Sequence, residues 1–354
     1  MKRILVIQQK RIGDVLTSTI ISNNLKKHFP EAKIDYMCYA NCVAILENNP
    51  NINEVIVLDE KVRKNYFSLA KFILYIRKKK YDVVIDVYSK FETNLITLFS
   101  GAKYKISYDK GYSNLFYTHN VKRIENGTQS EIGLAILNRL LLLKPLIKEG
   151  ITDYKPKIFL TDIEKQQGLT LLESHNIKKD KPILMFGILG SEWYKTYPFE
   201  KMAQIIDFTV SKTNARVLFN YIPSQKEDAQ KIYDLCKKET QQNIVFDLYA
   251  KELRGFLGLL SHCNALVGNE GGAVNMAKGL NVPTFSIFSP SVDKETWQIF
   301  EDEKNISIHL KDIKPEIYQQ STEKEIKQET FKYFDEYPFE LLLEKLESFY
   351  KTVL

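Results

Sequence analysis

Cysteine is scarce in this chain, which has four cysteines among 354 residues. Four are too few for a disulfide framework, and no C-x2-C pair is present. The pair Cys38 and Cys42 has no His-x3-His companion, so a zinc site is not expected. We predict that these two residues, together with Cys236 and Cys263, are buried reduced thiols of a cytoplasmic protein.

Long apolar runs are also missing. Residues 4–7 follow two basic residues, but the run ends after four residues, short of the roughly 7–15 of a signal-peptide core. The apolar stretch 134–147 is interrupted by Asn138, Arg139 and Lys144, so nothing reaches the ~18 residues of a transmembrane helix. The sequence therefore predicts a soluble protein.

The net charge of +6 is unevenly distributed. Residues 1–110 carry 19 Lys/Arg against 11 Asp/Glu, or +8, and residues 111–354 carry 31 against 33, or −2. The basic N-terminal part predicts an anionic partner on that side, with ordinary surface lysines as the simpler alternative.

The length exceeds the roughly 250–300 residues of a single core, so two domains are expected. Short β-branched runs alternate with helical patterns, and this series occurs twice. Continuous apolar strands separated by helices are typical of parallel sheets covered on both faces, which predicts an α/β fold with two doubly wound domains. The expected strands are 4–7, 34–38, 55–58, 83–87 and 104–107 in the first domain, and 183–188, 217–221, 244–248, 265–268, 284–288 and 306–310 in the second. Apolar residues at three- and four-residue steps over 339–353 predict a final amphipathic helix.

Residues suited to chemistry follow the first strand of the first domain. A loop ends in Gly13, which allows a sharp turn, and Asp14 begins a helix. Ligands of open α/β sheets bind at the carboxyl ends of strands, and a carboxylate there can accept a hydroxyl proton. An Asp at a helix start is also a common N-cap. No G-x-G-x-x-G follows the strand, which argues against a dinucleotide cofactor.

Two segments of the second domain are suited to phosphate. After strand 183–188, Ser191 offers a hydroxyl and Lys195 a cation. After strand 265–268, Glu270 precedes Gly271-Gly272 at a helix start, where free N–H groups bind anions and the carboxylate can accept hydrogen bonds from sugar hydroxyls. A solvated loop lysine and a simple glycine turn are the plainer interpretations.

In this order the segments resemble glycosyltransferase family 9, the heptosyltransferase-like enzymes of lipopolysaccharide assembly. The resemblance covers about residues 3–297 and includes the strand 81–86, the lysine loop 195–198 and the closing segment 268–272. Two positions depart from the family pattern. The family usually has Asp-Ser-Gly where this chain has Glu270-Gly271-Gly272, and its histidine corresponds most nearly to Asn275. These departures leave the donor sugar open.

The resemblance implies a GT-B fold, with two Rossmann-like domains facing across a cleft. Residues 1–155 would bind the acceptor, residues 156–328 would bind the nucleotide-sugar, and the helix within 329–354 would return to the first domain. The implied reaction is inverting transfer of a heptose or related sugar from a nucleotide-diphospho-sugar, foremost ADP-heptose, to a lipid-linked lipopolysaccharide core acceptor. No metal, cofactor or nucleic acid is expected, and the protein would be cytoplasmic, with peripheral contact at the inner face of the inner membrane.

The resemblance also assigns roles to residues. Asp14 would act as the base and Lys195 would stabilise the departing diphosphate. The other donor-binding residues would be Ser191, Thr196, Glu270, Gly271, Gly272, Ala273 and Asn275, and the acceptor-binding residues would be Lys10, Arg11 and Gly13.

Other functions stay open on the sequence alone. A relative acting on O-antigen or capsule is the main alternative, and a nucleotide-sugar-binding protein without transfer activity is another. A nucleotide-sugar epimerase or dehydrogenase lacks its dinucleotide fingerprint here. A nucleic-acid-binding protein would suit the pI of 8.8, but the aromatic residues do not interleave with Lys/Arg in a known RNA-binding pattern.

Overall fold

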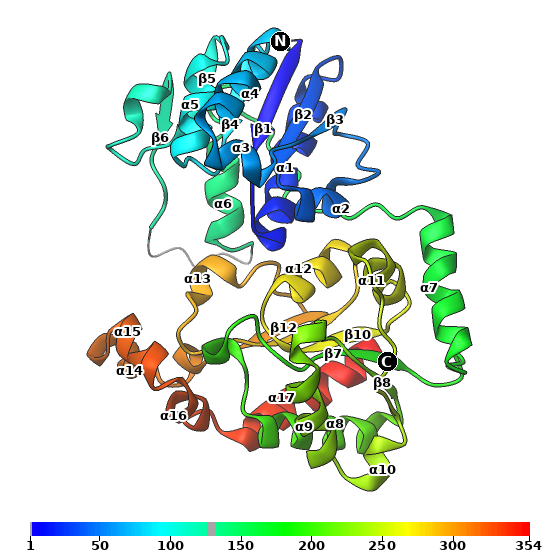
Figure 1. The fold of residues 1–354 in the computed structure, drawn as a ribbon. Helices are drawn as coiled ribbons and strands as arrows, with labels where there is room; N and C mark the ends of the chain where they lie inside the picture. The colour runs from blue at the N-terminus through cyan, green and yellow to red at the C-terminus, as the bar shows by residue number, and fades with distance from the viewer. Residues whose placement is uncertain (1, 126–131) are drawn as a thin grey trace. The chain divides into compact units, whose positions relative to one another are not determined.

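The computed structural model describes residues 2–125 and 132–354 and divides the chain into two compact units, Met1–Phe159 and Leu160–Leu354 (Figure 1). The division falls four residues after the expected position. Each unit contains a six-stranded sheet in which all paired strands are parallel. All eleven strands predicted from the sequence are present, and the four cysteines are buried and unpaired as predicted.

The first unit has the strand order β3-β2-β1-β4-β5-β6. Its strands are β1 (Arg3–Ile7), β2 (Lys33–Cys38), β3 (Glu54–Val57), β4 (Val83–Asp86), β5 (Tyr104–Tyr108) and β6 (His119–Val121). Its helices are α1 (Ile12–His28), α2 (Val43–Leu46), α3 (Glu60–Lys64), α4 (Tyr66–Lys78), α5 (Phe91–Phe99) and α6 (Leu134–Leu141).

Helices cover both faces of the first sheet. Alternate residues of β1, Leu5 and Ile7, share a core with Leu69 and Ile76 of α4 and Ile96 of α5. Helix α1 packs against α6 and α2 instead. A central parallel strand buried on both faces must be apolar throughout, which is why residues 4–7 form a continuous run rather than an alternating one.

The second unit has the strand order β12-β11-β10-β7-β8-β9. Its strands are β7 (Ile183–Gly187), β8 (Arg216–Phe219), β9 (Ile244–Val245), β10 (Ala265–Asn269), β11 (Thr284–Ile287) and β12 (Asn305–Ile308). Its helices are α7 (Asp162–Ser174), α8 (Phe199–Thr213), α9 (Lys226–Leu235), α10 (Lys238–Gln241), α11 (Leu253–Leu260), α12 (Gly272–Gly279), α13 (Lys294–Trp297), α14 (Pro315–Gln320), α15 (Glu323–Gln328), α16 (Thr330–Asp335) and α17 (Phe339–Val353).

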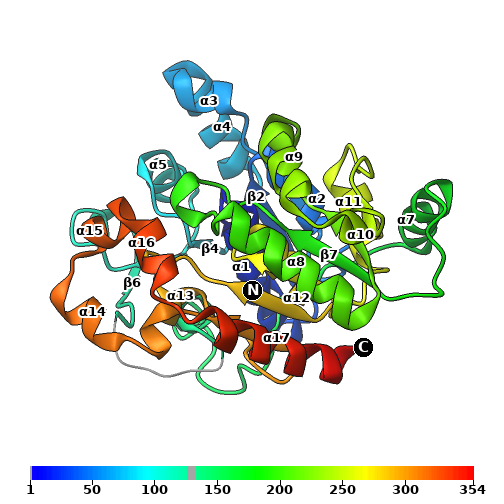
Figure 2. The same cartoon turned by 90° about the horizontal axis from the view of Figure 1, so that it is seen from below.

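The last helix, α17, packs within the second unit. Its buried stripe of Leu342, Leu346 and Phe349 belongs to the core of this unit, and the Phe349 ring lies 5.7 Å from that of Phe285 in β11. The hydroxyls of Tyr350 and of Thr209 in α8 are 2.7 Å apart, and Figure 2 shows α17 running beside α8. The predicted helix is confirmed, but its expected return to the first domain is wrong. Its apolar stripe fits the aromatic face of the second sheet.

Both sheets reverse their strand order at one point. Counted within each unit, the order is 3-2-1-4-5-6, and the reversal lies between β1 and β4 in the first unit and between β7 and β10 in the second. The loops that leave the carboxyl ends of these strands run in opposite directions, which leaves a crevice where ligands of doubly wound sheets bind. The fold therefore predicts a binding region at each of these two edges.

Candidate functional site

The first binding edge carries Asp14, at the third position of α1. Its Oδ2 accepts a hydrogen bond from the backbone N–H of Arg11 at 3.4 Å, so it acts partly as a reciprocal cap of the helix. Its Oδ1 accepts a bond from Arg139 Nη2 at 2.7 Å. The carboxylate is 27% exposed, so it is held by the protein and still accessible. Capping of the helix therefore accounts for only one of the two carboxylate oxygens of Asp14.

Arg139 of α6 holds this carboxylate in place. Its side chain is 8% exposed, and Nε donates to Ser18 Oγ at 2.8 Å while Nη1 donates to the carbonyl of Ala135 at 2.7 Å. All three nitrogens are thereby engaged, and α6 is fixed against α1. Arg139 was not among the site residues predicted from the sequence. An arginine inside an apolar helix was the available signal, because a buried guanidinium needs a carboxylate partner.

The three residues expected to bind the acceptor lie beside Asp14. Lys10 and Arg11 are exposed at the end of the loop, and Gly13 is the second residue of α1. The sharp turn expected at Gly13 is wrong, because the helix has already begun at Ile12.

Further cations gather at the carboxyl edge of the same sheet. Lys110, after β5, donates to the carbonyls of Tyr88 and Ser89 at 3.3 and 2.8 Å. Burial, with the nearby charges of Arg123 and Lys90, lowers its pKa to about 8. Asp86 offsets these positive charges in part, and an added anion at this edge would offset them further. Lys110 and Arg123 were not predicted from the sequence as site residues.

The strand 81–86, which contributes to the family resemblance, serves the fold rather than the site. The hydroxyl of Tyr81 donates to Asp35 at 2.6 Å. Asp82 accepts from the backbone N–H groups of residues 2 and 3. Asp86 accepts from Tyr117 and from the backbone of Ser89, and burial raises its pKa. These carboxylates hold the sheet and its loops together.

The second binding edge contains an ion pair between the two predicted segments. Lys195, in the loop between β7 and α8, donates from Nζ to Glu270 Oε1 at 2.9 Å. Their side chains are 19% and 8% exposed, so the pair is largely buried but still accessible through the lysine. The structure thus brings together two residues separated by 75 positions, and their charges offset one another.

The lysine loop has a tightly closed backbone. Thr196 donates its hydroxyl hydrogen to the carbonyl of Glu192 and accepts from the N–H of Gly190, both at 3.1 Å. A Cβ at Gly190 would lie 2.4 Å from the carbonyl of Lys195, so only glycine fits. Thr196 therefore shapes the loop. Ser191 is exposed beside it.

The glycine turn after β10 opens a helix end. Gly271 has φ 149° and ψ −161°, and α12 begins at Gly272. The first N–H bond back into the turn comes from Asn275, which donates to the carbonyl of Gly271 at 3.2 Å. The preceding N–H groups of the helix, including that of Ala273, are the unpaired donors of a helix start, and no side chain in the described part of the chain caps them. Among residues 2–125 and 132–354, and apart from the adjoining residues and the helix's own backbone, a Cβ at Gly271 or Gly272 would meet no atom within 4 Å.

Asn269 links the two segments and was missed as a site residue. It is buried, accepts the backbone N–H of Tyr197 at Oδ1 (2.7 Å) and donates from Nδ2 to the carbonyl of Gly187 at 2.9 Å. It thus fixes the end of β10 to both ends of the lysine loop, and its neighbour Glu270 is thereby set opposite Lys195. A polar residue ending an apolar strand was the available signal.

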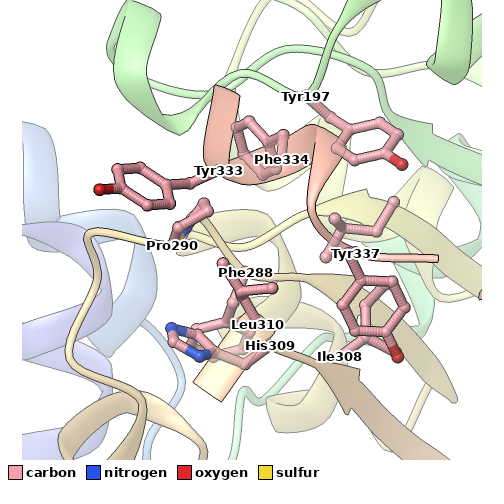
Figure 3. A pocket seen from close by; sticks show the side chains of 10 residues that line it. Tyr197, Phe288, Pro290, Ile308, His309, Leu310, Tyr333, Phe334 and Tyr337 are labelled. Carbon is pink, nitrogen blue, oxygen red and sulfur yellow. The ribbon is translucent and has the colours of Figure 1, made fainter. Parts of the chain in front are cut away.

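A small cavity behind this loop is too small for a sugar nucleotide. Its lining includes Tyr197, His309, Phe334 and Tyr337 (Figure 3), and it offers about 10 Å³ to the centre of a water molecule, enough for about one water. His309 accepts the N–H of Lys311 at Nδ1 and contacts the carbonyl of Val292 through Nε2, which fits the neutral ring with its proton on Nε2. Burial lowers the pKa of His309 to about 4.

Comparison with known proteins decides the family. The model of "Glycosyltransferase family 9 (heptosyltransferase)" matches residues 69–327. The chain belongs to this family. Lipopolysaccharide heptosyltransferase 3 of Escherichia coli is 24% identical over 298 residues, which cover 81% of this chain and 83% of that protein. Lipopolysaccharide heptosyltransferase 2 of Escherichia coli K12 is 24% identical over 306 residues, covering 82% and 83%.

Solved structures of the family share the fold. A family 9 glycosyl transferase from Veillonella parvula superposes with a TM-score of 0.78 at 19% identity, covering 98% of this chain and 97% of that one. The E. coli heptosyltransferase WaaC with ADP has a TM-score of 0.66 at 18% identity, covering 87% and 93%. The predicted GT-B class is confirmed, and this family 9 chain is a glycosyltransferase. Among the described residues, no helix is both long and apolar enough to cross a bilayer.

Proposed function

We propose that this family 9 enzyme transfers a heptose from ADP-heptose to a lipopolysaccharide core acceptor, with inversion in a single displacement. The observation that carries the proposal is the pairing of Lys195 with Glu270 beside an uncapped glycine turn, at the strand-order reversal of the second sheet. This combination suits a sugar attached to a diphosphate, because it offers a cation, free N–H groups and a carboxylate within one small region.

The second unit would bind the donor. The ammonium of Lys195 has three donors, so it can keep one on Glu270 and turn the others to a phosphate. The N–H groups of Gly272 and Ala273 would face the same diphosphate, and Glu270 and Asn275 would orient the sugar. Fixed donors aimed at the charge that develops on the leaving group stabilise the transition state without reorganisation.

The first unit would bind the acceptor and supply the base. Asp14 would take the proton of the attacking hydroxyl, with Arg139 fixing its orientation. Lys10, Arg11, Lys110 and Arg123 would attract the anionic groups of a lipid-linked saccharide, and the protein would meet this substrate at a membrane surface.

A related sugar is the second candidate for the donor. Glu270 and Asn275 stand where the family resemblance leads us to expect Asp and His, and both lie beside the glycine turn. A screen of ADP-, GDP- and UDP-sugars by thermal shift separates these candidates, because a ligand that binds only the folded state raises the melting temperature.

Two substitutions test the assignment of roles. Asp14→Asn should lower turnover by about 10²–10⁴ and leave ADP affinity unchanged, because it removes a base and no donor contact. Lys195→Ala should weaken ADP binding and lower the rate by about 10²–10³. Glu31→Gln and Lys251→Ala, at exposed positions, serve as matched controls. Loss of ADP binding in Asp14→Asn with turnover retained would contradict the base assignment.

A further inference from the structure

Helices α3 and α4 carry exposed apolar side chains together with a high concentration of positive charge. The segment 60–80 contains eight Lys/Arg and one Glu, a net charge of +7, whereas the whole chain carries +6. We define the basic–aromatic surface as the exposed residues Lys64, Tyr66, Phe67, Lys71, Leu74 and Lys78. This surface lies on the helical layer formed by α3, α4 and α5 (Figure 1).

Helix α4 is apolar on two opposite sides. Leu69 and Ile76 are 4% and 0% exposed and pack in the core of the first unit. On the other side, Phe67 and Leu74 are 84% and 57% exposed, and Tyr66, the first residue of the helix, is 82% exposed. Packing of α4 on its own sheet requires only the first side, and a surface helix ordinarily has polar residues on the second. The exposed apolar side is therefore available for a partner.

Cations flank this exposed side at helical spacing. Phe67, Lys71, Leu74 and Lys78 follow one another at steps of three and four residues, which places them along one face of α4. Within the described ranges 2–125 and 132–354, Lys64, Lys71 and Lys78 form no ion pair, whereas neighbouring Lys79 pairs with Glu54. Their charges are therefore free to act on a partner.

We propose that the basic–aromatic surface docks this enzyme on an anionic lipid bilayer. Phe67, Tyr66 and Leu74 would enter the boundary between headgroups and acyl chains, and the lysines would meet the anionic headgroups. Each lysine near such a surface strengthens binding by about fivefold. A second copy of this chain is a poor partner, because two copies of the segment 60–80, each with a net charge of +7, would repel each other. The phosphates of a nucleic acid would contact the lysines, but an exposed aliphatic residue such as Leu74 would have no matching contact.

The proposal rests on the proposed function in one respect, namely that the acceptor is lipid-linked. The experiment measures co-sedimentation of the full chain with vesicles of phosphatidylcholine containing 30% phosphatidylglycerol, and with phosphatidylcholine alone. We compare wild type with Lys71→Gln/Lys78→Gln and with Phe67→Ser. The matched controls are Lys178→Gln/Lys251→Gln and Ile163→Ser, which change exposed residues of the second unit.

We expect wild type to bind the anionic vesicles and the double lysine variant to bind them about 25-fold more weakly. Phe67→Ser should also reduce binding, and both controls should bind like wild type. In Phe67→Trp, the added fluorescence should shift to the blue with anionic vesicles, which reports insertion of this side chain. Equal binding by wild type and the α4 variants would overturn the proposal, as would a change from dimer to monomer in Phe67→Ser without any vesicle binding by wild type.

ADP affinity, measured on the same variants, separates the two proposals. Weaker vesicle binding with unchanged ADP affinity supports a docking surface separate from the donor site. If wild type binds ADP but not the vesicles, the docking proposal fails and the sugar-transfer proposal stands. If wild type binds the vesicles through α4 but no ADP, ADP-, GDP- or UDP-sugar, the docking surface stands and the proposed donor site fails.

Discussion

Substitution of Gly272 by alanine separates folding from donor binding. Gly272 is the first residue of α12, and an added Cβ would meet no atom of the described residues within 4 Å beyond its chain neighbours and its own helix. Alanine is favoured over glycine in helices and restricts the unfolded chain, so the change should add up to about 1 kcal/mol of stability. For a unit of this size that raises the melting temperature by about 0–4 °C.

The same methyl group should disturb donor binding. If the diphosphate lies against the N–H groups of Gly272 and Ala273, a methyl at this position holds it away from them. Loss of one charge-assisted hydrogen bond costs about 1.5–3 kcal/mol, which weakens binding about 10- to 150-fold. We therefore expect Gly272→Ala to melt at or above the wild-type temperature and to bind ADP at least tenfold more weakly, as measured by calorimetric titration.

Two other glycines make the comparison sharper. Gly271→Ala has the same free space but a φ of 149°, so strain of about 1–3 kcal/mol should lower its melting temperature. Gly255→Ala, in α11, meets only the Cβ of Ala250 at an ordinary 3.6 Å and should leave ADP affinity unchanged. Wild-type ADP affinity in a stably folded Gly272→Ala would refute the reasoning, because the diphosphate could not then lie at this turn.

Three further substitutions test the supporting residues. Arg139→Gln should lower the free energy of unfolding of the first unit by about 2 kcal/mol, as measured in denaturant. The loss is smaller than for a fully buried ion pair because Asp14 is 27% exposed, and no change would mean that the pair is dispensable. Asn269→Ala removes the partners of the Tyr197 N–H and the Gly187 carbonyl, so calorimetry should show a lower melting temperature and weaker ADP binding. Unchanged ADP affinity would exclude a role for Asn269 in positioning the donor site. The pKa of His309 is about 4 in the folded protein and higher in the unfolded chain, so protonation favours unfolding. As the pH falls from 6.5 to 4, the free energy of unfolding of wild type should decrease by about 3 kcal/mol relative to that of His309→Gln. Parallel stability curves against pH for the two proteins would contradict this.

The sequence predicted the sheets well because their signal is local. Strands such as residues 4–7 and 265–268 are buried on both faces, so each needs a continuous apolar run that is visible without knowing its neighbours. The edge strand β6 was missed because its three residues, 119–121, are only partly buried and carry no such run. The short helices α14 and α15 were missed for the same reason, since the segment 311–329 is largely polar.

Long-range pairings could not be predicted in the same way. The positions of Asp14 and Lys195 followed from strand ends, which are local features. Their partners Arg139 and Glu270 are 125 and 75 positions away, and only the strand order brings them close. The destination of α17 was wrong because an amphipathic period shows that a face is buried without showing what covers it.

Glu270 is fixed by the fold through its backbone and reaches the proposed donor site with its side chain. Its backbone N–H donates to the carbonyl of Ile287 at 3.0 Å, so its Cα is fixed at the end of the sheet. The carboxylate reaches Lys195 at 2.9 Å only through both methylenes of the side chain. The shorter aspartate expected from the family resemblance would draw the carboxylate back by about the length of one C–C bond, roughly 1.5 Å, and open the ion pair. The longer side chain of Glu270 therefore holds the lysine on the protein and brings its carboxylate closer to the lysine loop. If this pair binds the donor as proposed, we expect Glu270→Asp to change the preference among donor sugars.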